Sequence, residues 1–393
     1  MTRATCGPTT TARQALGPRL VEYRIRSAVL CRETRLRILF PIGYTEGSAR
    51  FPVLYLLHGG GDDYRAWTDK GDAAAATADL PFLVVMPDGG RGGFYSDWVL
   101  AGATGTPRWE SYHVGELLPW VDMTFRTDAR REGRALAGLS MGGFGAMSYA
   151  ARHPDLFVAA ASFSGAVDTS LYTHIYARAA RRDGGPRGAI WGDRRTDPMR
   201  WRAHNPVDLA PNLCGMALVL RTGTGMPGLL TPGARPDPVE AMVYHKSLRL
   251  HRRLLRLGIE HEWHSAAGGH DWPYWARDLR ATLPVLSRVF ADPPPRSDVL
   301  TYTSAEDSYH VHGWSVRMSR SGRTTLVITG VTGFSLTGEG FATVDTAPSY
   351  EPGRGYRVDG TSLVADRAGR LTVPVRLGVG RHTVRLTIEK DVP

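Results

Sequence analysis

Short apolar segments alternate with longer amphipathic ones through the first three quarters of the chain. Most of the apolar segments end in or just before glycine. Strands that are buried on both faces of a parallel sheet have this continuous apolar character, and the connecting helices alternate with them. The pattern predicts a doubly wound α/β domain. The expected strands are 53–57, 82–86, 135–137, 159–163, 217–220 and 260–264, and the main expected helices are 143–152 and 239–257.

The pattern changes after residue 291. Residues 292–297 include three consecutive prolines, which make a stiff and extended linker. Beyond them, apolar and polar residues alternate in short runs, with glycine-bearing turns between. This predicts an all-β, sandwich-like accessory domain. The expected division is a disordered leader over 1–19, an α/β domain over 20–291, a Pro-rich linker over 292–297 and a β domain over 298–393, with separate strands near 324–328, 372–376 and 383–387.

Composition narrows the functional classes. With 42% hydrophobic and 22% charged residues, the chain can form a sizeable core. The formal net charge of +10 comes almost entirely from arginine, because the only lysines are Lys70, Lys246 and Lys390. No dense basic run interleaved with aromatic residues occurs, so nucleic acid is not an expected partner. The three cysteines are too scattered for a disulfide framework, and no apolar run is long enough to span a bilayer.

One glycine-flanked serine has the pattern of a nucleophile. Gly138-Leu139-Ser140-Met141-Gly142 matches the G-x-S-x-G motif, in which a serine projects from a sharp strand-to-helix turn. An apolar strand precedes the motif and a helical stretch follows it, as this turn requires. The motif therefore predicts the α/β-hydrolase fold, with Ser140 as the nucleophile. The alternative is an ordinary glycine-rich turn with an idle serine.

A second glycine-rich segment follows the first expected strand. His58-Gly59-Gly60-Gly61 resembles the HGGG-type loop that supplies one donor of an oxyanion hole. The second donor is expected at the N–H of Met141, directly after the nucleophile. Such donors stabilise negative charge that develops in the transition state.

A serine nucleophile needs a base and an orienting acid. His270 is the best placed of the 13 histidines, because it lies in a loop after the last expected strand. The acid should lie between Ser140 and His270. Position in the chain alone leaves four candidates, namely Asp168, Asp237, Glu240 and Glu262. His261 and His264 lack a third ligand, so neither a metal nor another cofactor is expected.

Several stretches together resemble the esterase D family, and within it the secreted mycolyltransferases of the antigen 85 type. The resemblance covers roughly residues 20–286. It is carried by Tyr55-Leu56-Leu57-His58-Gly59, Val85-Met86-Pro87-Asp88-Gly89-Gly90, Phe94-Tyr95-Ser96-Asp97-Trp98, the serine motif, Trp191-Gly192 and Gly269-His270-Asp271-Trp272-Pro273-Tyr274-Trp275. The Phe-Tyr-x-Asp-Trp and His-x-Trp-x-Tyr-Trp stretches are much more specific than the serine motif.

The resemblance implies roles for individual residues. It places the nucleophile at Ser140, the base at His270 and the acid at Glu240, and it places the oxyanion donors at Gly60 and Met141. It makes Asp168 a substrate-binding residue in place of a member of the triad. The implied substrate-binding set is His58, Gly59, Gly61, Asp62, Trp98, Asp168, Asp271 and Trp272.

Three functions are compatible with these residues. The first is a serine carboxylic ester hydrolase acting on an acyl ester, including a sugar ester; the His-Gly spelling at residues 58–59 is commoner among ordinary esterases of the family. The second is an acyltransferase that moves the acyl group to a sugar hydroxyl. The third is a non-catalytic envelope or glycan-binding protein. The resemblance implies an extracellular or cell-envelope location, although the first 20 residues lack the apolar stretch of a signal peptide.

Overall fold

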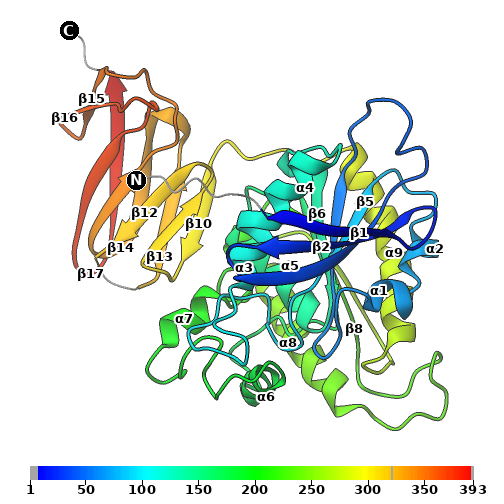
Figure 1. Cartoon of the computed structure of the whole chain (residues 1–393). Coiled ribbons are helices and arrows are strands. Elements are labelled where there is room, and N and C mark those ends of the chain that lie inside the picture. Colours follow the sequence, from blue (N-terminus) through cyan, green and yellow to red (C-terminus); the bar gives the residue numbers. More distant parts are fainter. Residues whose placement is uncertain (1–7, 320–321, 391–393) are drawn as a thin grey trace.

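The chain contains one mixed α/β sheet and one antiparallel sheet, each with its own core. A computed structural model describes residues 8–319 and 322–390 (Figure 1). The first sheet has the strand order β1-β2-β3-β5-β4-β6-β7-β8-β9. Its strands are β1 (Thr9–Ala15), β2 (Leu20–Ser27), β3 (Arg32–Leu39), β4 (Val53–Leu57), β5 (Leu83–Pro87), β6 (Arg134–Leu139), β7 (Ala159–Phe163), β8 (Ala217–Gly223) and β9 (Glu262–Ala266).

The six strands from β5 to β9 in this order run parallel, and β1 to β3 extend the sheet in antiparallel fashion. Strands β4 to β7 are buried along their whole length, which explains their unbroken apolar sequences. The helices are α1 (Ala66–Asp69), α2 (Ala73–Ala76), α3 (Trp109–Tyr112), η1 (His113–Leu117), α4 (Leu118–Thr124), η2 (Arg131–Gly133), α5 (Met141–Arg152), α6 (His174–Arg182), α7 (Pro198–Ala203), η3 (Ala210–Leu213), α8 (Pro238–Arg256) and α9 (Trp272–Ala291).

Alternate residues of the buried strands serve two different cores. In β4, Tyr55 and Leu57 belong to a core that includes residues of α4, α5 and α8. Leu54 and Leu56 point to the opposite face, where residues of α1, α2 and α9 pack. Helices therefore cover both faces of the sheet, and the predicted α/β-hydrolase architecture is confirmed.

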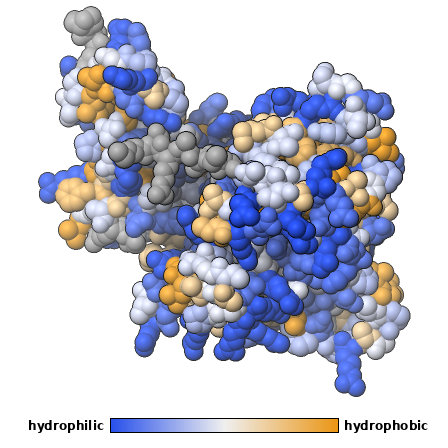
Figure 2. Space-filling view, viewed as in Figure 1, coloured by the Kyte–Doolittle hydropathy of each residue, from blue (hydrophilic) through white to orange (hydrophobic). Residues whose placement is uncertain are grey.

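The prediction of a disordered leader is wrong for residues 8–19. Strand β1 pairs with β2 at the edge of the sheet, although all seven of its side chains are exposed. Its polar sequence hid it, because an edge strand is held by backbone hydrogen bonds to one neighbour and needs no apolar face. Hydrophilic residues predominate over the face of the molecule that Figure 2 shows, which includes β1. Residues 1–7 of the expected leader lie outside the described residues.

The second sheet starts after α9 and the proline-rich segment. It is antiparallel, with the order β10-β13-β14-β17-β15-β16, and the hairpin β11-β12 joins it at β14. Its elements are β10 (Leu300–Ser304), β11 (Ser308–Val311), β12 (Trp314–Met318), β13 (Thr324–Ile328), η4 (Gly330–Thr332), β14 (Gly333–Asp345), β15 (Gly355–Val358), β16 (Thr361–Val364) and β17 (Thr372–Lys390). The predicted all-β character of this region is confirmed, and the division of the chain into domains stays a prediction.

The two short runs expected at 372–376 and 383–387 form one long strand, β17. Its two halves pair with two halves of β14, and the register shifts beside Gly338 and Gly340. Gly378 and Gly380 have positive φ values opposite this irregularity. Glycine therefore bends the ribbon here where the sequence suggested a turn between separate strands.

The two units meet through hydrogen bonds between η3, α5 and β10. The Asn212 side chain accepts a bond from the Thr303 N–H at 2.7 Å and donates one to the Thr303 carbonyl at 2.8 Å. Arg152 forms ion pairs with Glu110 at 2.6 Å and with Glu306 at 2.9 Å. Because Glu306 follows β10, these ion pairs also join the α/β unit to the second unit. Within the described ranges, no helix is long and apolar enough to cross a membrane.

Glu110→Gln is expected to destabilise the protein by about 3 kcal/mol at pH 7, because it leaves Arg152, whose side chain is only 13% exposed, without the charge of its buried partner. Burial opposes the ionisation of Glu110, but Arg152 and His153 outweigh it and hold its pKa well below the usual range. A lowered folded-state pKa stabilises the protein above the unfolded value of about 4.3, and this stabilisation is lost as the pH falls.

Urea unfolding of both proteins at pH 7 and pH 3.5 measures this effect. The difference between wild type and Glu110→Gln should shrink at the lower pH. Glu306→Gln is the matched control, since Glu306 is 31% exposed and should contribute less than about 1 kcal/mol. An equal difference at both pH values would contradict the assignment.

Candidate active site

Ser140 occupies a sharp turn between β6 and α5. Its backbone has φ 52° and ψ −112°, which is an unfavourable region for a residue with a side chain. The neighbouring glycines have no room for a Cβ: one on Gly138 would lie 2.4 Å from the Gly142 carbonyl oxygen, and one on Gly142 would lie 2.4 Å from the Leu57 carbonyl oxygen. Close packing of the turn against β4 therefore requires both glycines, and it lifts Ser140 out of the sheet.

The structure brings Ser140, His270 and Glu240 into one chain of hydrogen bonds. Ser140 Oγ lies 2.9 Å from His270 Nε2, and His270 Nδ1 lies 2.6 Å from Glu240 Oε2. These groups come from the start of α5, the loop before α9 and the first turn of α8. Glu240 is completely buried, whereas the His270 side chain is 14% exposed. The histidine therefore reaches both the buried carboxylate and a partly open serine.

The second oxygen of Glu240 is held by residues that the sequence did not single out. Oε1 accepts hydrogen bonds from Ser164 Oγ at 2.7 Å, Thr222 Oγ1 at 3.0 Å and the Gly223 N–H. Ser164 directly follows β7, and the other two residues end β8. Their position at the carboxyl ends of parallel strands is the one signal that could have identified them. Three donors fix the buried carboxylate and compensate for its lost hydration.

Asp237, one of the four acid candidates, accepts hydrogen bonds from backbone N–H groups. Its carboxylate caps α8 by accepting from the N–H groups of Val239 and Glu240, and it also accepts from the His270 N–H at 2.7 Å. Burial opposes its ionisation, but these backbone donors outweigh burial and lower the pKa of Asp237. Asp237 therefore ties the His270 loop to the start of the helix that carries Glu240.

The loop His58–Gly61 lies beside the serine turn. His58 is buried, and its Nε2 accepts a hydrogen bond from the Gly89 N–H at 2.9 Å. Tyr95 donates to the His58 carbonyl, and the Gly61 N–H donates to the Arg91 carbonyl at 2.7 Å. In the described part of the chain, no protein acceptor meets the Gly60 N–H. His58 and Gly61 therefore anchor the loop and leave the donor of Gly60 available.

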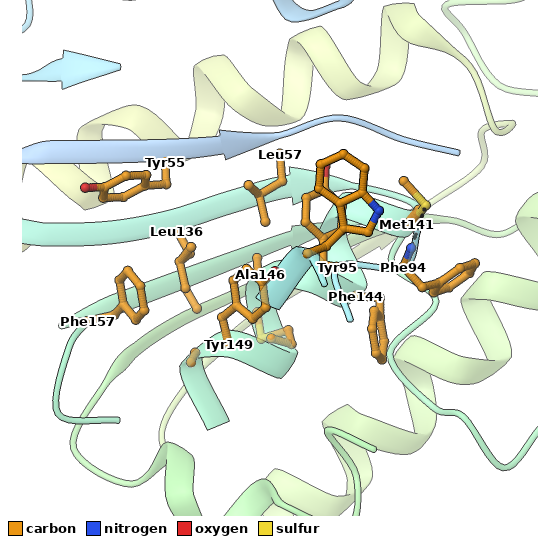
Figure 3. Packing of buried hydrophobic residues seen from close by; sticks show 14 of the residues in the cluster. Tyr55, Leu57, Phe94, Tyr95, Leu136, Met141, Phe144, Ala146, Tyr149 and Phe157 are labelled. Atoms are coloured by element: carbon orange, nitrogen blue, oxygen red, sulfur yellow. Dashed lines mark hydrogen bonds between the residues drawn. The ribbon is translucent and has the colours of Figure 1, made fainter. Parts of the chain in front are cut away.

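The aromatic residues of the Phe94–Trp98 stretch are buried, and Phe94 packs against the helix that follows the Ser140 turn. Figure 3 shows Phe94 beside Met141 and Phe144 in the core. The Phe94 N–H contacts Met141 Sδ at 3.3 Å, and the Phe94 and Phe144 rings are 5.5 Å apart. Phe94, Tyr95 and Trp98 are at most 5% exposed. Phe94 therefore belongs to the packed core under the serine, and all three aromatic side chains are buried.

The other substrate-binding candidates have separate positions. Asp62 forms an ion pair with Lys70 at 2.7 Å near the glycine loop. Asp271 caps α9 by accepting from the Trp272 N–H, and the Trp272 ring packs edge-on against Trp67 at 5.3 Å. Asp62, Asp271 and Trp272 thus border the Gly60 or His270 loops.

Trp98 and Asp168 are not brought to the serine by any contact in the described residues. Trp98 lines a cavity of about 870 Å³ that also includes Arg152 and Glu306, at the boundary of the two units. Asp168 is fully buried, and its carboxylate meets the Ser170 N–H at 2.8 Å and Arg249 at 2.9 Å. Within the described ranges, no three His, Cys, Asp or Glu side chains are grouped as a metal site would require.

Comparisons with known proteins find an esterase and acyltransferases similar to this chain. Esterase Rv1288 of Mycobacterium tuberculosis is 36% identical over 268 residues, which are 64% of this chain and 56% of that protein. This chain therefore spans little more than half of that relative. Diacylglycerol acyltransferase/mycolyltransferase Ag85B of Mycolicibacterium smegmatis is 30% identical over 262 residues, covering 63% of this chain and 80% of that protein.

Solved structures share the fold. The fluorophosphonate-binding serine hydrolase FphF of Staphylococcus aureus has a TM-score of 0.56 at 18% identity, and covers 69% of this chain and 99% of its own. MPT51 of Mycobacterium tuberculosis has a TM-score of 0.55 at 22% identity, over 71% and 99% of the two chains. The family model described as "Putative esterase" matches residues 27–286. Because this match covers well over half of the chain, the protein belongs to that esterase family.

Proposed function

We propose that the protein is a serine ester hydrolase that works through an acyl-enzyme. The observation that carries this proposal is the chain of hydrogen bonds from Ser140 Oγ through the His270 ring to Glu240. Ser140 attacks the carbonyl carbon of the ester while His270 Nε2 takes its proton. Glu240 orients the ring and stabilises the imidazolium that forms.

Two backbone donors complete the proposed mechanism. As the carbonyl oxygen becomes negative, the N–H groups of Gly60 and Met141 stabilise it. His270 then returns the proton to the leaving alcohol, and the acyl group stays on Ser140. Water, activated by His270, releases the acid and restores the serine. We propose Gly59, Gly61, Asp62, Asp271 and Trp272 as the wall of the substrate site, with the buried His58 anchoring the glycine loop. Trp98 and Asp168 stay predictions as substrate-binding residues, because no contact joins them to Ser140 within the described residues.

The second candidate is acyl transfer by the same intermediate, with a sugar hydroxyl in place of water. The 30% identity to the Ag85B acyltransferase supports it. The substrate would then be a glycolipid or another acylated small molecule. An extracellular or cell-envelope location agrees with this candidate and stays a prediction.

Product analysis separates the two reactions. The protein is expected to hydrolyse 4-nitrophenyl butyrate, and the products are followed by mass spectrometry with increasing trehalose or glucose. Free butyrate at every acceptor concentration supports hydrolysis, whereas a butyryl sugar that increases with acceptor supports transfer. The proposal is wrong if the ester is not cleaved and a fluorophosphonate does not label Ser140.

A further inference from the structure

Arg182 brings a guanidinium group to the glycine loop that borders Ser140. It is the last residue of α6 (green, at the bottom of Figure 1), far from the loop in sequence. A Cβ placed on Gly60 would lie 2.7 Å from Arg182 Nη1 and 3.8 Å from Met141 Cβ. The missing side chain of Gly60 thus makes room for the guanidinium next to Gly60, whose N–H is one of the two proposed oxyanion donors.

Arg182 has no partner of its own within the described residues. Neither its side chain nor those of Arg91 and Arg178 takes part in a hydrogen bond or ion pair there. The two nearby carboxylates are already engaged. Asp62 pairs with Lys70 at 2.7 Å, and Asp183 accepts from the backbone N–H groups of Arg91 and Gly92.

Two other arginines lie close enough to Arg182 to affect its charge. Burial is the main effect that lowers the pKa of Arg182, and Arg178 and Arg91 lower it further. These two cations act on Arg182 more strongly than Asp183 and Asp62 do. The arginine cluster, consisting of Arg91, Arg178 and Arg182, is therefore an exposed positive site in which no arginine side chain forms a direct ion pair within the described residues. A bound anion would relieve this unfavourable charge.

We propose that the arginine cluster is a substrate subsite that binds a carboxylate or phosphate close to the scissile ester. The preferred substrates would then be anionic esters, such as half-esters of dicarboxylic acids or acyl esters of acidic sugars. Guanidinium suits this role because its planar fork can give two parallel hydrogen bonds to one carboxylate or phosphate. The proposal rests on the ester hydrolysis proposed above and names its substrate class.

Matched pairs of esters test the proposal and locate the charge. 4-Nitrophenyl hemisuccinate against 4-nitrophenyl butyrate places a carboxylate on the acyl side, and 4-acetoxybenzoate against 4-acetoxybenzamide places it on the leaving group. For at least one pair, the ratio of kcat/KM for the anionic ester to that for the neutral ester should fall about tenfold or more in Arg182→Gln. Arg182→Lys should retain part of the preference.

Salt and a control variant complete the experiment. Raising NaCl from 0.05 to 0.5 M should lower the same ratio in the wild type, because salt screens a partly exposed site. Arg252→Gln is the control that also removes one positive charge. Arg252 is exposed on α8, twelve residues after Glu240 and about 18 Å further along the helix. It should leave the ratio as in the wild type.

The outcomes distinguish this proposal from the function on which it rests. If both pairs give the same ratio in wild type and Arg182→Gln, or if Arg182→Gln slows neutral and anionic esters equally, no anion subsite exists. If Arg182→Gln does not fold, Arg91→Gln and the salt series decide the question by the same ratio. Failure of the wild type to cleave any ester would instead refute the proposed hydrolase.

Discussion

Ser140→Ala is expected to lower kcat for 4-nitrophenyl butyrate about a millionfold, because it removes the oxygen proposed to form the acyl-enzyme. Ser140 Oγ lies 2.9 Å from His270 Nε2, so its proton has an acceptor at hydrogen-bond distance. The residual rate would come from substrate binding and the two backbone donors. Stopped-flow or long-incubation assays with active-site titration measure the loss and exclude contaminating wild-type enzyme.

The control for this prediction is Ser287→Ala. Ser287 lies in α9, where its hydroxyl bonds only to the Leu283 carbonyl of the same helix. This variant should keep the wild-type kcat, and circular dichroism should report the same fold for both. Retention of more than a tenth of the activity by Ser140→Ala would rule out the acyl-enzyme on this residue.

Glu240→Gln is expected to lower kcat by about 10³- to 10⁴-fold and to change KM little. The buried Oε1 position receives three donors, from Ser164, Thr222 and Gly223. The amide oxygen of glutamine will keep that position, so its NH₂ group will face the His270 ring. Nδ1 must then accept a hydrogen bond, and the ring proton moves to Nε2. A protonated Nε2 cannot take the proton of Ser140.

Glu262→Gln is the matched control, because Glu262 was another acid candidate from the sequence. It lies in β9, is 38% exposed and contacts His264, so its loss should change kcat less than twofold. Steady-state kinetics with the same ester compare the two variants. Equal kcat values for Glu240→Gln and the wild type would show that the carboxylate does not orient the base.

The elements that build the site follow local sequence rules closely. The parallel strands are continuous apolar runs because helices cover both of their faces. The serine turn has glycine at 138 and 142 because a Cβ there would collide with backbone oxygens. Such requirements act on residues next to one another, so the sequence expresses them directly. The polar strand β1 and the single strand β17 were misjudged because partner strands, and not their own side chains, hold them in place.

Sequence by itself determined the α/β-hydrolase fold, the all-β C-terminal region and the serine at the turn, because apolar periodicity and glycine spacing encode them locally. Position along the chain left four acidic candidates and the family resemblance implied Glu240; the tertiary structure shows that Glu240 meets His270 and that Asp237 ties the histidine loop to α8. Only the tertiary structure shows that Arg182 lies against Gly60. These contacts join residues 30 to more than 100 positions apart, and such pairs meet only when the packed sheet aligns the ends of its strands.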